Sequence, residues 1–148
     1  MDRSEVQRML SAALNPPDVD SEEDDFEEFL EKLRFFFSEN LVLAALDLVD
    51  RENVIRLSTP WGYSHFEILG STGSYTVFPG FPSTREPGKY DSPPFCTCPA
   101  FAYAVLLSKS ELMCKHLLAA AIARKLSQCV ERTIGKAELT EVSSRQCS

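Results

Sequence analysis

Three cysteines and one histidine lie close together in the second half of the sequence, at spacings that suit a metal ion. Cys96 and Cys98 form a Cys-x-Cys pair, and Cys114 and His116 form a Cys-x-His pair after a fifteen-residue insert. Thiolate sulfur and imidazole nitrogen are ligands that Zn²⁺ binds in proteins, four at a time in a tetrahedron. Four protein ligands leave no position for water, so the pattern predicts one structural zinc ion.

The two pairs need different backbone conformations to reach one point. In an extended segment residues i and i+2 point to the same side, so Cys96 and Cys98 can converge at the end of a strand. In a helix these positions point about 200° apart, so Cys114 and His116 cannot both lie in mid-helix. The spacing therefore predicts a helix that starts between them, with Cys114 at the cap and His116 in the first turn. A helix N-terminus there favours thiolates.

The alternative interpretation is that these are ordinary buried cysteines with a surface histidine, because free cysteine is among the most buried residue types. The joint pattern of two pairs before an apolar helix favours the metal site. The chain has five cysteines and starts without the pattern of a secretion signal. We therefore expect an intracellular protein with reduced thiols rather than a disulfide framework. Cys129 and Cys147 lie outside the pattern and are expected to be free.

Hydrophobic periodicity predicts the elements that position these residues. Helical spacing dominates before residue 52, and β-branched and aromatic stretches separated by turn residues follow from residue 53. Phe101, Val105 and Leu106 are expected to pack a short helix between the two ligand pairs, and the helix after His116 is expected to end near Val130. The predicted fold class is α+β, with N-terminal helices, a small antiparallel β meander and a zinc-clamped C-terminal helical lobe.

The same patterns divide the chain into four parts. Residues 1–25 are predicted to hold an N-terminal helix and an acidic linker, and residues 26–52 a helical pair that packs on the body. Residues 53–128 are predicted to hold the meander and the zinc finger, with the metal window at 96–116, and residues 129–148 a polar tail. The first helix is short and amphipathic, and the second carries a wide apolar stripe; each either packs on the body or docks on a partner. Candidate partner-facing residues are Val6, Leu10, Leu14, Phe29 and Phe36.

The charge distribution limits nucleic-acid binding. The net charge is −7, but nine acids and no base lie between Asp18 and Glu31, so the rest of the chain is nearly neutral. The acidic run is either a solvated linker or an element that binds a basic partner. An acidic chain cannot be a nucleic-acid platform over its whole surface, although a local basic face is possible. Candidate contacts for single-stranded DNA are Arg85, Lys89, Lys109, Lys115, Arg124 and Lys125.

An enzymatic zinc site is a poorer fit to the sequence. His65 and Glu67, followed by Pro94, Phe95 and Cys96, superficially match the H-x-E…P-C-x-x-C layout of zinc deaminases. A Cys-x-Cys pair has one residue too few for that layout, and a site built on His65 would leave the Cys-x-His pair without a role. The sequence therefore predicts a protein without enzymatic activity.

The ligand pattern resembles the SWIM zinc finger, whose pattern is CxC…CxH. Three further stretches, ALDLVDR from Ala45, ILGS from Ile68 and CPAFA from Cys98, resemble the small SWIM-domain subunit of the animal Shu complex. The resemblance covers residues 35–126. It implies a nuclear adaptor that pairs with an ATPase-like paralogue of the strand-exchange recombinase. Such a pair promotes assembly or stability of the recombinase filament in homologous recombination, and contacts single-stranded DNA mainly through the complex.

Overall fold

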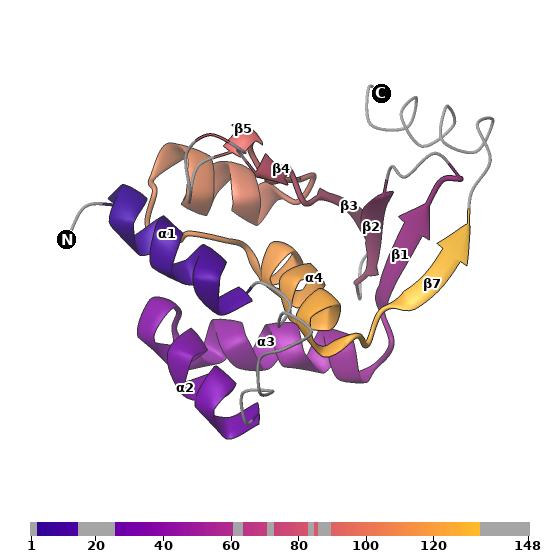
Figure 1. Cartoon of the computed structure of the whole chain (residues 1–148), viewed down its shortest axis with the longest axis horizontal. Coiled ribbons are helices and arrows are strands. Elements are labelled where there is room, and N and C mark those ends of the chain that lie inside the picture. Colours follow the sequence, from indigo (N-terminus) through magenta and orange to yellow (C-terminus); the bar gives the residue numbers. More distant parts are fainter. Residues whose placement is uncertain are drawn as a thin grey trace.

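A computed structural model describes residues 3–14, 26–60, 64–70, 73–82, 85 and 90–133 of the chain, and places helices against a mixed β-sheet (Figure 1). The helical elements are α1 (Arg3–Leu14), α2 (Phe26–Phe36), α3 (Glu39–Asp50), the π-helical η1 (Phe101–Leu107) and α4 (Lys115–Leu126). The strands are β1 (Val54–Ser58), β2 (Ser64–Leu69), β3 (Ser74–Phe78), β4 (Phe81–Pro82), β5 (Tyr90–Ser92), β6 (Phe95–Cys96) and β7 (Val130–Thr133).

The sheet contains the predicted meander and two further strands. Strands β1, β2 and β3 pair antiparallel in sequence order, and the full order is β6-β3-β2-β1-β7. Strand β6 pairs antiparallel with β3 and places Cys96 opposite Val77. This pairing joins the first ligand pair to the meander. Strands β4 and β5 form a separate two-stranded ladder in the segment between β3 and β6.

Strand β7 corrects the predicted end of the last helix and the predicted start of the polar tail. Helix α4 ends at Leu126 rather than near Val130, because Ser127 takes a left-handed conformation with φ 55°. The chain then returns along the sheet, and Val130 pairs with Ile55 in a parallel ladder. On one face of the sheet, Ile55, Leu57 and Val130 form a small apolar cluster apart from the main core.

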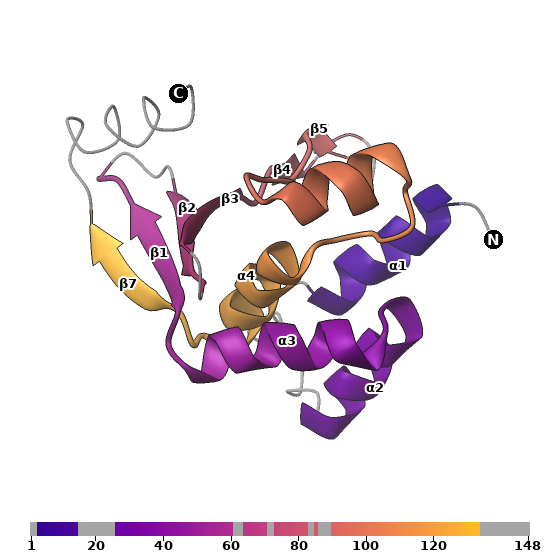
Figure 2. The ribbon, with the colours of Figure 1, turned by 180° about the vertical axis from the view of Figure 1, so that it is seen from behind.

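Helix α4 lies at the centre of the main core, between α3 and the sheet (Figure 2). Its residues Leu118, Ile122 and Ala123 have no exposed surface. Ser38 caps α3, since its side chain accepts a hydrogen bond from the Leu41 backbone N–H at 3.3 Å. The buried face of α3 consists of Val42, Ala45, Leu48 and Val49.

Helix α1 folds onto the body, and much of the predicted partner face is core. Leu10 and Leu14 are buried in the same cluster as α4, and Phe29 of α2 is 1% exposed. These three side chains therefore offer no surface to a partner. Phe36 packs against the core with part of its surface exposed, and Val6 is half-buried. The apolar faces of the first two helices are therefore used within the fold, where they cover the buried surfaces of α2 and α4. No helix in the described ranges is long and apolar enough to cross a membrane.

Two phenylalanines of α2 allow a matched test of this packing. Phe29→Ala is expected to lower the free energy of unfolding by about 3–5 kcal/mol, because it removes a fully buried ring and leaves a cavity. Phe35, in the same helix, is 66% exposed, so Phe35→Ala is expected to change stability by no more than about 0.5 kcal/mol. Urea denaturation of both variants measures the difference. Equal losses would mean that α2 does not pack as described.

Candidate metal centre

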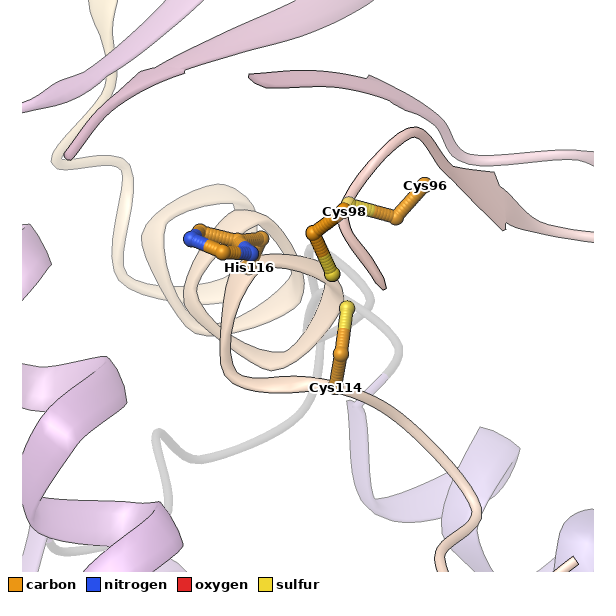
Figure 3. Close-up of side chains that lie close together, drawn as sticks. All are labelled: Cys96, Cys98, Cys114 and His116. Atoms are coloured by element: carbon orange, nitrogen blue, oxygen red, sulfur yellow. The ribbon is translucent and has the colours of Figure 1, made fainter. Parts of the chain in front are cut away.

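The end of β6 and the start of α4 bring the four predicted ligands together (Figure 3). The sulfur atoms of Cys96, Cys98 and Cys114 and a ring nitrogen of His116 all lie within 4.8 Å of one another, and all four residues are buried. Sulfur ligands of a tetrahedral zinc ion lie about 3.8 Å apart, so a small contraction around one ion suffices. Three sulfurs and one imidazole make a donor set that suits zinc.

His116 also supports the fit of a metal ion. Its Nδ1 atom is buried and has no hydrogen-bond partner within the part of the chain that the structure describes. A buried polar atom without a partner is costly, and a metal ion bound at Nδ1 would be such a partner. The ring stacks on Tyr75 of β3, with centroids 4.5 Å apart and planes at 33°. The Tyr75 ring therefore restricts the orientation of the imidazole.

Backbone pairing to β3 fixes the first half of the site. The Thr97 backbone N–H donates to the Thr76 carbonyl at 3.1 Å, and the Thr76 N–H donates to Thr97 Oγ1 at 3.0 Å. These bonds continue the β3–β6 pairing beyond Cys96 and so hold the residue between the two cysteines. The Phe101 N–H then donates to Cys98 Sγ at 3.3 Å. A donor aimed at this sulfur stabilises its thiolate form.

The helix start fixes the second half, as the spacing predicts. Cys114 is the N-cap of α4, with φ −80° and ψ 169°, and its Sγ accepts a hydrogen bond from the Leu117 N–H at 3.5 Å. Serine, threonine, aspartate or asparagine usually fills this position. Here a sulfur atom both caps the helix and faces the other ligands, and His116 follows in the first turn. The sequence did not single out Tyr75, Thr76 or Thr97, although Tyr75 shares a strand face with Val77.

The pKa values of the three thiols are shifted in different directions. The pKa of Cys98 lies far below its usual range, because the side chains of Cys114 and Cys96 hydrogen-bond to its sulfur. The pKa of Cys96 is raised by its hydrogen bonds to Cys114 and Cys98 and by burial. The pKa of Cys114 is raised to about 11: its bond with Cys96 lowers the value, but its bond to Cys98 and burial outweigh that effect. In this arrangement, therefore, Cys98 is the thiol that loses its proton most readily, and Cys96 and Cys114 hold theirs more tightly.

The candidate DNA contacts on α4 lie at opposite ends of the helix. Lys115 is its first residue and is exposed, whereas Arg124 and Lys125 lie in its last turn and are half-buried. The Lys125 ammonium lies 5.3 Å from the centre of the Phe29 ring, so this side chain takes part in packing α2 against α4. The structure thus separates Lys115 from the other two cations.

The other candidate cations lie in connecting segments. Lys109 is exposed in the turn after η1, with φ 54°, and Arg85 is exposed between β4 and β5. Lys89 lies outside the described residues. Cys129 is half-buried and not in a disulfide, as expected, and Cys147 lies outside the described residues.

The fold and the ligands define a zinc-finger protein in which a strand end and a helix start share one structural ion. The profile of the SWIM zinc finger matches residues 75–125. Zinc finger SWIM domain-containing protein 7 of Danio rerio is 36% identical over 121 residues, 81% of this chain and 77% of that protein. The Mus musculus protein of that name is 36% identical over 117 residues, 78% of this chain and 68% of its own length.

The Homo sapiens protein is 32% identical over 117 residues, 78% of this chain and 74% of its own length. No solved structure matches the chain. The chain therefore belongs to the SWIM zinc-finger family and is a homologue of zinc finger SWIM domain-containing protein 7. This result confirms the family and the zinc ion predicted from the ligand spacing.

Loss of one ligand is expected to unfold the half of the protein around the site. Cys114→Ala removes both a zinc ligand and the cap of the central helix, and structural zinc is worth about 10–16 kcal/mol in small fingers. We expect less than stoichiometric zinc by elemental analysis and loss of the cooperative thermal transition by circular dichroism. Chelation of the wild-type protein should do the same. Cys129→Ala is the control and should keep both zinc and transition; an unchanged melt for Cys114→Ala would contradict the assignment.

Zinc binding is also expected to release protons and to weaken as pH falls. Without the ion this half of the protein is unfolded, and free thiols with a pKa of about 8.5 hold their protons near neutral pH, so the ion must displace one from each of Cys96, Cys98 and Cys114. Around neutral pH, log K for zinc should therefore rise with pH, with a slope of about three protons per ion. Competition titrations with a chelator of known affinity, performed at several pH values, measure the slope. A pH-independent constant would show that the thiols are already ionised.

Proposed function

We propose that this chain is a non-enzymatic adaptor subunit that pairs with an ATPase-like recombinase paralogue in the nucleus. The pair would promote assembly or stability of the recombinase filament during homologous recombination DNA repair. One observation carries the proposal: the ion has four buried protein ligands from two different elements, in a chain of the SWIM family. Four protein ligands leave no position on the ion for water or substrate, so the ion stabilises the fold and takes no part in a reaction. We therefore look for the function in binding to other proteins.

The position of His65 argues against the enzymatic alternative. His65 lies on β2, fully buried, and stacks on Phe78 with centroids 5.8 Å apart. Phe78 pairs with Phe95, whereas Cys96 pairs with Val77 on the adjacent position. Because neighbouring residues of a strand point to opposite faces, His65 and Cys96 lie on opposite sides of the sheet. His65 therefore cannot join the ligands in a deaminase-like site.

The charge of the chain supports DNA binding mainly by the partner subunit. A net charge of −7 and cations at opposite ends of α4 give phosphates little to bind. In the proposed complex the ATPase-like partner supplies most of the contact with single-stranded DNA, and this chain stabilises the partner.

Co-expression with the recombinase-paralogue subunit from the same genome tests this function. The two chains are expected to co-elute in size-exclusion chromatography, and Cys98→Ser should abolish the complex because it opens the metal site. In fluorescence anisotropy with a labelled single strand, the complex should bind and the isolated chain should not. Binding by the isolated chain that falls steeply between about 50 and 200 mM salt would instead indicate a direct DNA-binding module. Separate elution of the two wild-type chains would refute the pairing.

A further inference from the structure

The two cysteines of the first ligand pair need a bend between them. In a straight strand residues i and i+2 lie about 6.6 Å apart, because each residue rises about 3.3 Å. The sulfur atoms of Cys96 and Cys98 lie within 4.8 Å of each other, and two sulfurs on one zinc ion need about 3.8 Å. Strand β6 ends at Cys96, and the side chain of Cys98, beyond it, points toward Cys114 (Figure 3). The residue between the two cysteines therefore determines how the chain leaves the sheet.

Thr97, in this position, completes the ladder with its side chain in place of its own carbonyl group. Val77 pairs with Cys96, so the next pair along the two strands is Thr76 with Thr97. In an antiparallel ladder a hydrogen-bonded pair exchanges two bonds, each from a backbone N–H to the backbone carbonyl opposite. The Thr97 N–H makes this regular bond to the Thr76 carbonyl, at 3.1 Å. The Thr76 N–H donates instead to Thr97 Oγ1, at 3.0 Å.

This exchange of acceptors releases the Thr97 carbonyl from the ladder. Both backbone groups of Thr76 remain bonded, while the peptide that joins Thr97 to Cys98 is free to turn out of the strand. A carbonyl bonded to Thr76 would hold this peptide in the strand and carry Cys98 onward along it. Serine and threonine hydroxyls compete with backbone groups in this way elsewhere in proteins, and β-branched threonine also suits a strand.

The bend continues into a turn that begins at Cys98. Cys98 Sγ accepts the backbone N–H of Phe101 at 3.3 Å, three residues on, just as Cys114 Sγ caps α4. The turn leads into η1, where the buried Phe101 ring contacts the Phe95 ring at 5.3 Å between centroids. Leu106, further along η1, is 52% exposed, so the prediction that it packs inward was wrong. Cys98 is thus held by the start of η1 on one side and by Thr97 on the other.

We propose that Thr97 is the positioning residue of the first ligand pair. Its hydroxyl takes the place of a backbone acceptor and so sets the bend that brings Cys98 to the ion. The side chain is exposed, so it contributes this bond rather than core packing. Position 97 then requires a short side chain with an acceptor oxygen. Serine meets this requirement, whereas valine has the shape of threonine without the hydroxyl.

Thr97→Val and Thr97→Ser test the proposal in the whole chain, with zinc affinity measured by competition with a chelator. Partners that orient metal ligands contribute about 10–100-fold to affinity, so Thr97→Val is expected to bind zinc about 10-fold more weakly. Thr97→Ser keeps the acceptor and should bind about as tightly as wild type. Thr76→Val is the matched control, because Thr76 supplies only backbone groups to the pair, and should also bind as wild type.

Cobalt(II) in place of zinc distinguishes positioning from a general loss of stability. The visible absorption of a cobalt site depends on how its sulfur and nitrogen ligands are arranged. For Thr97→Val the cobalt bands should shift or weaken, while circular dichroism at saturating metal shows the wild-type secondary structure. A variant that is merely less stable would give the wild-type bands once it is folded around the metal.

The outcomes that would overturn the proposal are specific. Wild-type affinity and a wild-type cobalt spectrum for Thr97→Val would refute the role of the hydroxyl. An equal loss of affinity in Thr97→Ser would refute it too, because serine keeps the bond. If Thr97→Val does not fold even with excess zinc, Thr97→Ala and Thr97→Ser are compared instead, since they differ only in the hydroxyl. The alanine variant should then bind zinc more weakly, and equal affinities would contradict the proposal.

Discussion

The structure depends on one junction, where the edge of a sheet and the first turn of the core helix are joined through a metal ion. Structural zinc contributes about 10–16 kcal/mol, as much as the whole stability of an ordinary domain. The main core is built around α4, and α4 begins at a ligand. The ion therefore determines where the core helix starts and how it meets the sheet. The helices α1, α2 and α3 then cover the surface of α4 that the sheet leaves open.

Strand β3 is the element through which the sheet reaches the ion. Three consecutive residues of β3 contact the site in different ways. Tyr75 stacks on the imidazole ring, the backbone of Thr76 bonds to the residue between the two cysteines, and Val77 pairs with Cys96. Alternation along one strand thus provides an aromatic contact, a backbone bond and a register. A one-residue slip of β3 would turn its side chains to the opposite faces of the sheet and so move Tyr75 and Val77 away from the site. The four ligands set the distances to the ion, whereas β3 sets the orientation of the ligand side chains around it.

The sequence predicted the site better than it predicted the sheet. The positions of the ligands and the cap at Cys114 followed from local geometry, because i and i+2 spacing allows few backbone solutions. The meander followed for the same reason, from alternation within short segments. Strand β7 was missed because Val-Glu-Arg-Thr is short and mostly exposed, and its pairing with β1 depends on the whole chain between them. The inward packing of Leu10 and Leu14 was left open because periodicity shows an apolar face but not what covers it. Lys125 above Phe29 carries no sequence signal.

The parallel ladder between β1 and β7 bears on the order of events during synthesis. Leu57 pairs with Arg132, near the end of the described chain, so the edge of β1 stays open while the ribosome makes everything between them. Open strand edges invite pairing with other chains, and long-range contacts form slowly. The nascent polypeptide therefore exposes the apolar edge of β1 until residues 130–133 emerge. The folded sheet ends instead at β7, whose Glu131 and Arg132 are exposed charges of the kind that discourage pairing between chains.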